Sequence, residues 1–235
     1  MYHFFLALTA ALWYGFPARK MIVIGITGTK GKTSTVELLH EILAQSRQKV
    51  ASSSSLRFRT GDAVTPNDLK MTMPGRFFLQ RFLYRAKQAG CRYVVLEVTS
   101  QGIMQHRQRF IKFDPAVLTN VAPEHIEAHG GFENYIAVKR KLFRGVAPGG
   151  AIILNRDDVQ SASFARVAMA HTKIWYGHGG IDFSDRHISL DGVRIDASGI
   201  SFMADAVPFR SSLQGAFNLS NILAALVFET PQGSI

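Results

Sequence analysis

A glycine-rich loop near the start of the 235-residue chain is the feature that most restricts its fold. The loop runs from Gly28 to Thr33 and reads Gly-Thr-Lys-Gly-Lys-Thr. It follows Met21–Thr27 (MIVIGIT), a β-branched run typical of a strand buried on both faces. It precedes Ser34–Gln45, in which apolar residues recur at helical spacing. A strand, a glycine-rich turn and a helix in this order are the context of a phosphate-binding loop.

The loop has the residue types that binding of a nucleoside triphosphate requires. Gly28 and Gly31 let backbone N–H groups approach phosphate oxygens, and the next helix presents its positive end to the same anion. We expect Lys32 to reach the β- and γ-phosphates and Thr33 to bind Mg²⁺. Ile26 stands where the strict pattern has its first glycine, so a glycine-rich turn without nucleotide is the alternative. The residues predicted to contact ATP are Gly28, Thr29, Lys30, Gly31, Lys32, Thr33 and Ser34.

Strand-like and helix-like segments alternate through the middle of the chain. Phe77–Ala89 and Tyr135–Phe143 have the apolar spacing of helices. Short apolar runs typical of buried strands occupy Arg92–Val98, Ala116–Asn120 and Ala151–Asn155. This alternation predicts an α/β fold with a doubly wound, mostly parallel sheet.

A different pattern begins near Trp175. Short alternating runs at His187–Leu190, Val193–Ile195 and Ile200–Met203 are separated by glycine and aspartate. They predict a small antiparallel β appendage over about residues 175–210. A helical pattern returns at Asn218–Phe228.

The segment before the first strand is apolar. Phe4–Pro17 carries no charge and is followed by Arg19 and Lys20. It is shorter than the roughly 20 residues that span a bilayer, and it lacks the pattern of a signal peptide. We expect residues 1–20 to form a helix packed on the domain; an anchor lying in a membrane surface is the alternative.

The chain is basic and contains one cysteine. Lys and Arg number 27 and Asp and Glu number 17, for a formal charge of +10. Such an excess suits nucleic acid, an anionic membrane or phosphorylated small molecules. No nucleic-acid-binding motif accompanies the scattered basic residues, so we expect no nucleic-acid partner. The single Cys91 excludes an internal disulfide and fits a reducing cytoplasm, and we expect a cytoplasmic protein, with membrane association as the alternative.

Six short segments follow one another along the chain: Gly25–Thr35 (GITGTKGKTST), Leu96–Gln101 (LEVTSQ), Leu118–His125 (LTNVAPEH), Tyr135–Phe143 (YIAVKRKLF), Ile153–Asp158 (ILNRDD) and Gly215–Asn221 (GAFNLSN). In order and spacing they are similar to motifs of the Mur ligases, which join amino acids to peptidoglycan precursors through an acyl phosphate. Together they cover Val23 to about Leu226. The chain therefore resembles the central ATP-binding domain of that family, and residues 21–235 are predicted to form it.

The resemblance implies a site with two Mg²⁺ ions. Glu97 would bind one ion together with Thr33, and His125 would help to bind the second. Lys139, fourteen positions after His125, matches a lysine that the family carbamoylates with CO₂, which turns a cation into an oxygen ligand. Lys32, His125 and carbamoylated Lys139 would then stabilise the acyl phosphate. The alternatives are a carboxylate paired with lysine, a surface histidine and a solvated helix lysine.

The resemblance also implies residues that contact the acceptor, a UDP-N-acetylmuramoyl-peptide, and it is nearest to the family's tripeptide synthetases. Leu69–Gly75 and Thr99–Arg107 are similar to their acceptor-binding segments. Gln101 stands where these enzymes usually have histidine. The implied contacts are Thr72, Met73, Pro74, Thr99, Gln105 and Arg107. Asn218 and Asn221 match a pair near the adenine; as polar residues opening a helix, they also suit a cap.

Complete Mur ligases also have an N-terminal UDP-binding domain and a C-terminal domain that selects the amino acid. The chain given matches neither, so we expect a fragment, a protein that needs a partner to supply the C-terminal domain, or a protein that is no longer a full ligase. The predicted function is ATP-dependent addition of an amino acid to the acceptor. The alternatives are a non-catalytic or partner-dependent module that binds ATP or precursor, and another amide ligase of the superfamily, such as folylpolyglutamate or cyanophycin synthetase.

Overall fold

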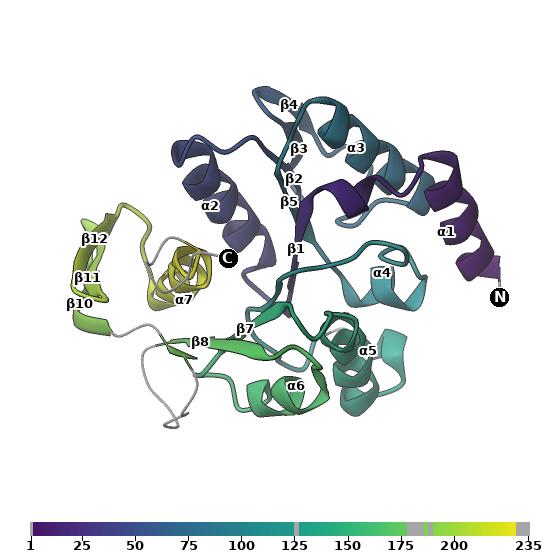
Figure 1. Ribbon diagram of the computed structural model, residues 1–235. Coiled ribbons are helices and arrows are strands. Elements are labelled where there is room, and N and C mark those ends of the chain that lie inside the picture. The colour runs from purple at the N-terminus through teal and green to yellow at the C-terminus, as the bar shows by residue number, and fades with distance from the viewer. Residues whose placement is uncertain (1, 125–126, 178–185, 188–189, 229–235) are drawn as a thin grey trace.

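A nine-stranded sheet forms the centre of the protein in the computed structural model, which describes residues 2–124, 127–177, 186–187 and 190–228 (Figure 1). Its order among these residues is β4-β3-β2-β5-β1-β6-β7-β8-β9. The parallel strands are β2 (Val50–Ser53), β5 (Tyr93–Glu97), β1 (Ile22–Thr27), β6 (Ala116–Leu118), β7 (Ala151–Asn155), β8 (Thr172–Tyr176) and β9 (Arg186–His187). At one edge β3 (Arg57–Thr60) and β4 (Ala63–Pro66) run antiparallel.

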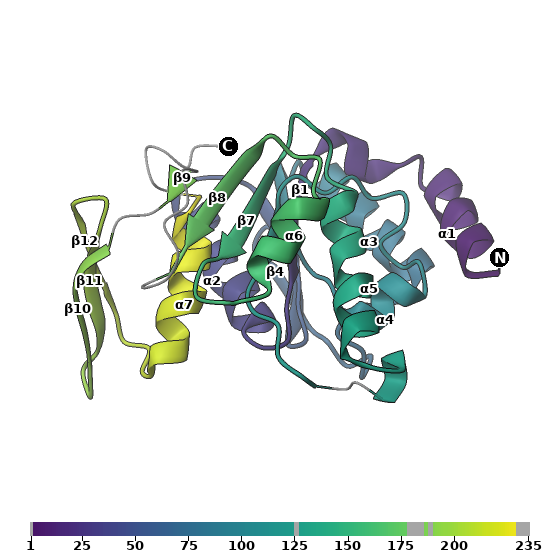
Figure 2. The ribbon, with the colours of Figure 1, turned by 90° about the horizontal axis from the view of Figure 1, so that it is seen from below.

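Helices cover both faces of this sheet (Figure 2). One face packs against α2 (Lys32–Gln45) and α7 (Ala216–Leu226). The other packs against α3 (Arg76–Gln88), α5 (Phe132–Arg144) and α6 (Ser161–Val167), with the short α4 (Ser100–Met104) beside α5. Side chains alternate between the two cores along β1, since Val23 lies in the second core and Ile24 in the first. The predicted doubly wound, mostly parallel α/β fold is confirmed.

The register of the central strands brings functional segments to one edge. Ile26 of β1 lies opposite Glu97 of β5, and Thr27 lies opposite Leu118 of β6. Because the three strands are parallel, their carboxyl ends meet at the same edge. The loops that follow them are therefore neighbours, which is where open α/β sheets bind ligands.

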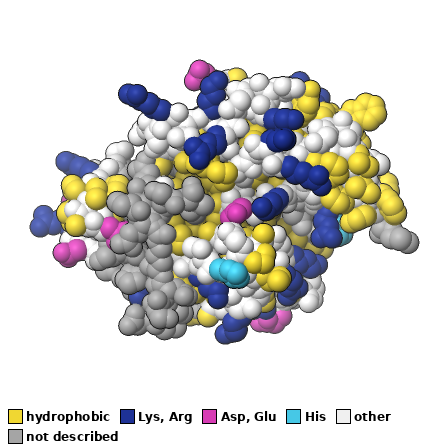
Figure 3. Space-filling view, in the orientation of Figure 1, with side chains coloured by type: hydrophobic (Ala, Val, Ile, Leu, Met, Phe, Trp, Pro, Cys, Tyr) yellow, Lys and Arg dark blue, Asp and Glu magenta, His cyan; other side chains and the backbone are white. Residues whose placement is uncertain are grey.

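The apolar N-terminal segment forms α1 (Tyr2–Trp13) and a 3₁₀ turn, η1 (Pro17–Lys20). Helix α1 packs on α3 through the buried Ala7, Ala10 and Ala11. Other apolar side chains of the helix remain exposed, and Figure 3 shows hydrophobic side chains gathered over this part of the surface. Within the described part of the chain, no helix has the length and apolar character needed to cross a bilayer.

A three-stranded antiparallel sheet lies outside α7, made of β10 (Leu190–Asp196), β11 (Gly199–Ala204) and β12 (Val207–Ser211) (Figure 1). The alternating Ile200, Phe202 and Ala204 of β11 are buried in the core that contains α7. The appendage predicted near the C-terminus is confirmed, but its start was placed too early. The apolar end of Thr172–Tyr176 is buried in the central sheet as β8, and residues 178–185 and 188–189 lie outside the described chain.

Candidate nucleotide-binding site

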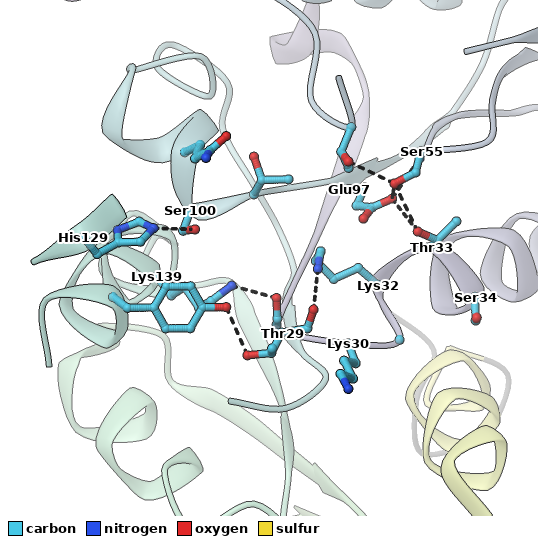
Figure 4. Close-up of a pocket in the computed structure, with 16 residues that line it drawn as sticks. Thr29, Lys30, Lys32, Thr33, Ser34, Ser55, Glu97, Ser100, His129 and Lys139 are labelled. Atoms are coloured by element: carbon cyan, nitrogen blue, oxygen red, sulfur yellow. Dashed lines mark hydrogen bonds between the residues drawn. The ribbon is translucent and has the colours of Figure 1, made fainter. Parts of the chain in front are cut away.

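A cavity of ≈ 600 Å³ lies at the carboxyl edge of the central strands (Figure 4). It receives residues from the glycine-rich loop, from the start of α2, from the ends of β2 and β5, and from α5. The lining residues are Gly28, Thr29, Lys30, Gly31, Lys32, Thr33, Ser34, Ser55, Thr72, Glu97, Thr99, Ser100, Gln101, His129, Tyr135 and Lys139. All seven predicted loop residues are among them.

The backbone of the loop depends on its glycines. Gly31 has φ +81°, a left-handed conformation that L side chains rarely adopt, and a Cβ there would overlap Oδ1 of Asn221. A Cβ on Gly28 would overlap the hydroxyl of Thr119. The loop thus lies against β6 and α7 at van der Waals distance, which leaves its other side open to the cavity.

Helix α2 begins at Lys32, directly after the loop. Its N-cap residue is Gly31, which supplies no side chain to bond the first N–H groups of the helix. Such N–H groups, together with the helix dipole, attract an anion. Lys32 Nζ donates a 2.8 Å hydrogen bond to the carbonyl oxygen of Thr29, so its cation lies over the loop (Figure 4). Burial lowers the pKa of Lys32, and the nearby Glu97 and Glu124 carboxylates oppose that shift.

Three oxygen-bearing side chains meet at the start of α2, close to Lys32. The carboxylate of Glu97, at the end of β5, is 3% exposed and accepts a 2.9 Å hydrogen bond from the hydroxyl of Thr33. It also accepts bonds from the backbone N–H of Ser55, at 3.0 Å, and from the Ser55 hydroxyl, at 3.1 Å. Carboxylate and hydroxyl oxygens are the ligands that Mg²⁺ prefers. The alternative of a strand-end carboxylate paired with a lysine does not describe this arrangement.

Lys139 is a buried cation facing the loop from α5. The residue is 2% exposed, and its Nζ donates a 2.7 Å hydrogen bond to the carbonyl oxygen of Gly28. The same nitrogen lies 4.5 Å from the ring centroid of Tyr135. Burial, and then the positive charge of Lys32, lower the pKa of Lys139 to about 7, although Glu124 and Glu97 act in the opposite direction. The alternative of an ordinary solvated helix lysine is wrong at this position, because the side chain is buried.

Five polar residues of the cavity wall were not predicted as site residues: Ser55, Ser100, Gln101, His129 and Tyr135. The hydroxyl groups of Tyr135 and Thr29 are 3.0 Å apart, so α5 is joined to the loop beside Lys139. Ser100 Oγ lies 3.1 Å from Nε2 of the buried His129. Ser55 bonds Glu97 as described above. A usable signal existed for Ser100, which follows the predicted strand Arg92–Val98. Ser55 follows β2, which was not predicted from the sequence, and no sequence spacing singles out His129.

The residues predicted to contact an acceptor form a cluster of which only part reaches the cavity. Thr72 and Thr99 line it, and Thr99 Oγ1 also caps α4 by accepting a 3.0 Å bond from the N–H of Gly102. Met73 and Pro74 are buried behind the wall. Arg107 donates to the carbonyl oxygen of Met73 and, at 2.7 Å, to the side chain of Gln105.

The remaining predicted residues lie elsewhere. Asn218 and Asn221 are on α7, bonded to each other at 3.2 Å, and do not line the cavity, although Asn221 abuts Gly31. The cap alternative is wrong in its simple form, because Gly215 is the N-cap; Asn218 instead reaches back to the carbonyl oxygen of Gln214. His125 lies outside the described residues. Within those residues, no cluster of three or more His, Cys, Asp or Glu side chains is arranged to hold a metal.

The loop and the sheet define an α/β protein with a phosphate-binding loop at the carboxyl edge of a doubly wound sheet. The family model described as the Mur ligase middle domain matches residues 26–228. This match covers most of the chain, which therefore belongs to the Mur ligase family, as the sequence motifs predicted.

Individual relatives agree with this assignment. The chain is 34% identical over 227 residues to the UDP-N-acetylmuramoyl-L-alanyl-D-glutamate--2,6-diaminopimelate ligase of Geobacter sulfurreducens, covering 92% of this chain and 43% of the relative. It is 32% identical over 244 residues to the UDP-N-acetylmuramyl-tripeptide synthetase of Roseiflexus sp., covering 97% of this chain and 47% of the relative. A solved structure of a UDP-N-acetylmuramoyl-L-alanyl-D-glutamate--2,6-diaminopimelate ligase superposes with a TM-score of 0.76 at 22% identity, covering 92% of this chain and 44% of that one. The chain spans less than half the length of these relatives.

Proposed function

We propose that the chain binds Mg·ATP and forms the ATP-binding core of a ligase that adds an amino acid to a UDP-N-acetylmuramoyl-peptide through an acyl phosphate. One observation carries the proposal: a single cavity joins the glycine-rich loop, the Glu97–Thr33 pair and the buried Lys139. The names of the two relatives support the acceptor class and the reaction.

The loop fits the triphosphate of ATP. The N–H groups of Thr29 and Lys30 are bonded to Asn120. The donors left for phosphate are therefore those at the uncapped start of α2, where the helix dipole adds to the attraction. Lys32 would exchange its bond to the Thr29 carbonyl for the β- and γ-phosphates. Asn221 lies behind the loop at Gly31, and we assign it support of the loop rather than contact with the adenine.

The oxygen donors at the end of the loop and of β5 fit Mg²⁺. Thr33 and Glu97 would hold one ion, and Ser55, already bonded to Glu97, would keep the carboxylate oriented. When bound, the ion neutralises phosphate charge and polarises the phosphoryl group. A second ion would be held with the help of Lys139 in its carbamate form, and of His125.

The environment of Lys139 favours carbamoylation. Only a neutral amine attacks CO₂; the new N–C bond releases one proton and leaves an anionic carbamate. With a pKa of about 7, a large share of Lys139 is neutral at cellular pH, unlike an exposed lysine near 10.5. The carbamate reverses the sign of the charge beside the phosphates, so a lysine here can contribute to a cation site.

In the proposed reaction, the terminal carboxylate of the acceptor attacks the γ-phosphorus of ATP. The bond to the β-phosphate oxygen breaks, giving ADP and an acyl phosphate, and the amine of the incoming amino acid then displaces phosphate to form the peptide bond. Negative charge develops on the leaving β-phosphate oxygen, and the ammonium group of Lys32 neutralises that charge. Thr72 and Thr99 are the predicted acceptor contacts that face the cavity, while Gln105 and Arg107 hold the segment of Met73 and Pro74 behind it.

Binding and turnover are tested separately. Calorimetry with Mg·ATP tests the core of the proposal, and an absence of affinity at millimolar Mg²⁺ would refute it. Turnover is measured as phosphate released on adding UDP-N-acetylmuramoyl-L-alanyl-D-glutamate with candidate amino acids. ATP binding without acceptor-dependent phosphate release would instead identify a non-catalytic nucleotide-binding module.

A further inference from the structure

One side of α1 is an exposed apolar face. Tyr2 is 71% exposed, Phe5 56%, Leu12 58% and Trp13 80%. Tyr2, Phe5 and Leu12 are separated by three and seven residues, which places them on one stripe of the helix, and Trp13 borders that stripe. Thr9 lies on the same stripe and is exposed, and its hydroxyl donates a 3.0 Å hydrogen bond to the carbonyl oxygen of Phe5 within the helix.

This face points away from the protein body. The buried residues of α1, namely Ala7, Ala10 and Ala11, lie on the opposite side, against α3. Small side chains let the two helices approach closely and leave the large side chains outside. A helix that is apolar all round is ordinarily covered on every side, so the exposed face indicates an interaction surface.

The apolar face continues onto α3. The rings of Tyr14 and Tyr84 are 5.9 Å apart, and Tyr84 and Phe77 of α3 are themselves exposed. The combined surface, α1 with the outer side of α3, is called the α1 face below.

The segments that form and flank the α1 face carry only positive charge. No Asp or Glu occurs in residues 1–36, 69–96 or 98–113, which supply α1, η1, α3 and the segment after α4. Arg76 Nη2 lies 2.7 Å from His3 Nδ1, Arg109 lies 5.7 Å from the ring centroid of Phe4, and Arg19 lies 4.3 Å from that of Phe16. Further basic residues of these segments include Lys20, Arg81, Arg85, Lys87 and Lys112.

We propose that the α1 face docks the protein onto the surface of an anionic membrane. Tyr2, Phe5, Leu12 and Trp13 enter the interfacial layer with α1 lying in the membrane plane, and the surrounding arginines and lysines contact lipid phosphates. Tryptophan and tyrosine are the residues that favour this layer. A protein partner of matching charge is the other class of occupant, but an apolar strip framed by cations on several elements suits a broad anionic surface better. The proposal uses no residue of the ATP cavity and so is independent of the proposed function.

Two tryptophans of the chain allow a direct measurement. Trp13 is 80% exposed, whereas Trp175 is 2% exposed in the core, so a change in emission on adding vesicles reports on α1. The full chain is titrated with phosphatidylcholine vesicles and with vesicles containing about one third phosphatidylglycerol. We expect a blue shift and co-sedimentation with the anionic vesicles. Without either, the docking proposal fails.

The double variant Phe5→Gln, Leu12→Gln keeps Trp13 and uses a good helix former. We expect it to lower vesicle affinity at least tenfold while Mg·ATP affinity and the melting temperature stay near those of the wild type. Val159→Gln is the matched control, because Val159 is 90% exposed on another part of the chain. A double variant that binds vesicles as well as the wild type overturns the proposal.

Charge is tested with Arg81→Gln and Arg85→Gln, each of which should weaken binding to anionic vesicles by about fivefold, and with Arg166→Gln on α6, which should not. Light scattering completes the test. If the wild type is a dimer and the Phe5→Gln, Leu12→Gln variant is a monomer, a second copy of the chain covers the α1 face. That result would contradict the proposal.

Discussion

The ammonium nitrogen of Lys139 lies 2.7 Å from the carbonyl oxygen of Gly28, so helix α5 is bonded directly to the glycine-rich loop. The contact places a buried amine beside the position expected for the phosphates, with Lys32 on the same loop. Burial lowers the pKa of Lys139, and the positive charge of Lys32 lowers it further. Helix α5 therefore both fixes the loop and sets the protonation of the residue that we assign to the metal site.

Stability should depend on pH through Lys139. Its pKa of about 7 in the folded protein is below the ordinary 10.5, so between these values the unfolded chain binds more protons. Burial of the charged amine destabilises the folded protein in full below pH 7, and this destabilisation decreases as the pH rises. From pH 6.5 to 9, in CO₂-free buffer, the free energy of unfolding should rise by about 1–3 kcal/mol more in the wild type than in Lys139→Met. Urea denaturation at several pH values measures this; parallel curves for the two proteins would contradict it.

Gly31→Ala should disrupt the loop. An alanine at φ +81° is strained by about 1–2 kcal/mol, and its Cβ overlaps Asn221 Oδ1, so we expect a loss of about 2 kcal/mol or more together with loss of ATP affinity. Gly149→Ala is the control, because no atom lies within 4 Å of its Cβ position. It should leave the melting temperature unchanged or raise it. Equal melting temperatures for the two variants would show that the loop relaxes freely around Asn221.

The elements that the sequence predicted well are those with long periodic patterns. Ala151–Asn155 was predicted with its observed bounds, and α2, α3, α5 and α7 within a few residues. The strands β2, β3 and β4 were missed, because Ser52–Ser55 resembles a polar tract and the two edge strands are four residues long. Ser52 and Ser53 are buried only because they pair with β5, and such tertiary burial leaves no local signal.

Some residues of the candidate site could be predicted from the sequence and others could not. The loop, Glu97 and Lys139 were predictable because they stand at strand ends or in motifs of fixed spacing. The pairing of Tyr135 with Thr29 was not, since it joins residues 106 positions apart. Predicted acceptor residues such as Met73 proved to support the cavity wall, because a motif specifies proximity but not which side chain is exposed.

Glu97→Gln should raise the Mg²⁺ requirement of ATP binding. The amide keeps a hydrogen-bond acceptor for Ser55 but removes the charge next to Thr33. We expect ATP affinity at fixed millimolar Mg²⁺ to fall about tenfold or more, since bonds to charged groups contribute roughly 1.5–3 kcal/mol. Calorimetry over a Mg²⁺ series measures the shift, with Glu133→Gln on the exposed side of α5 as control. If the two variants respond alike to Mg²⁺, Glu97 is not a ligand.

Lys32→Ala should weaken ATP binding by about 1.5–3 kcal/mol, because it removes a partly buried charge-assisted contact from the loop. The exposed Lys87→Ala on α3 carries the same change of net charge and should bind ATP normally. Isothermal titration at one ionic strength separates a specific contact from a general effect of charge. Similar losses in both variants would mean that ATP responds only to the net positive charge.

Lys139→Ala should retain most ATP affinity but lose acyl-phosphate formation. The phosphates are held mainly by the loop and Lys32, whereas a carbamate on Lys139 would act on the metal site. A small carboxylate such as acetate fits the space left by the side chain and supplies the missing oxygens, so it should restore part of the rate in Lys139→Ala and none in the wild type. Removing CO₂ from the buffer should slow the wild type and leave the variant unchanged.

Lys141→Ala, two positions along α5 and exposed, is the control and should behave as wild type throughout. The readout is hydroxamate trapping of the acyl phosphate in whichever preparation shows turnover, together with carbon-13 NMR of the protein in labelled bicarbonate. A near-normal rate in Lys139→Ala, or no carbamate signal in an active wild type, would return Lys139 to a purely structural role as the tether of the loop at Gly28.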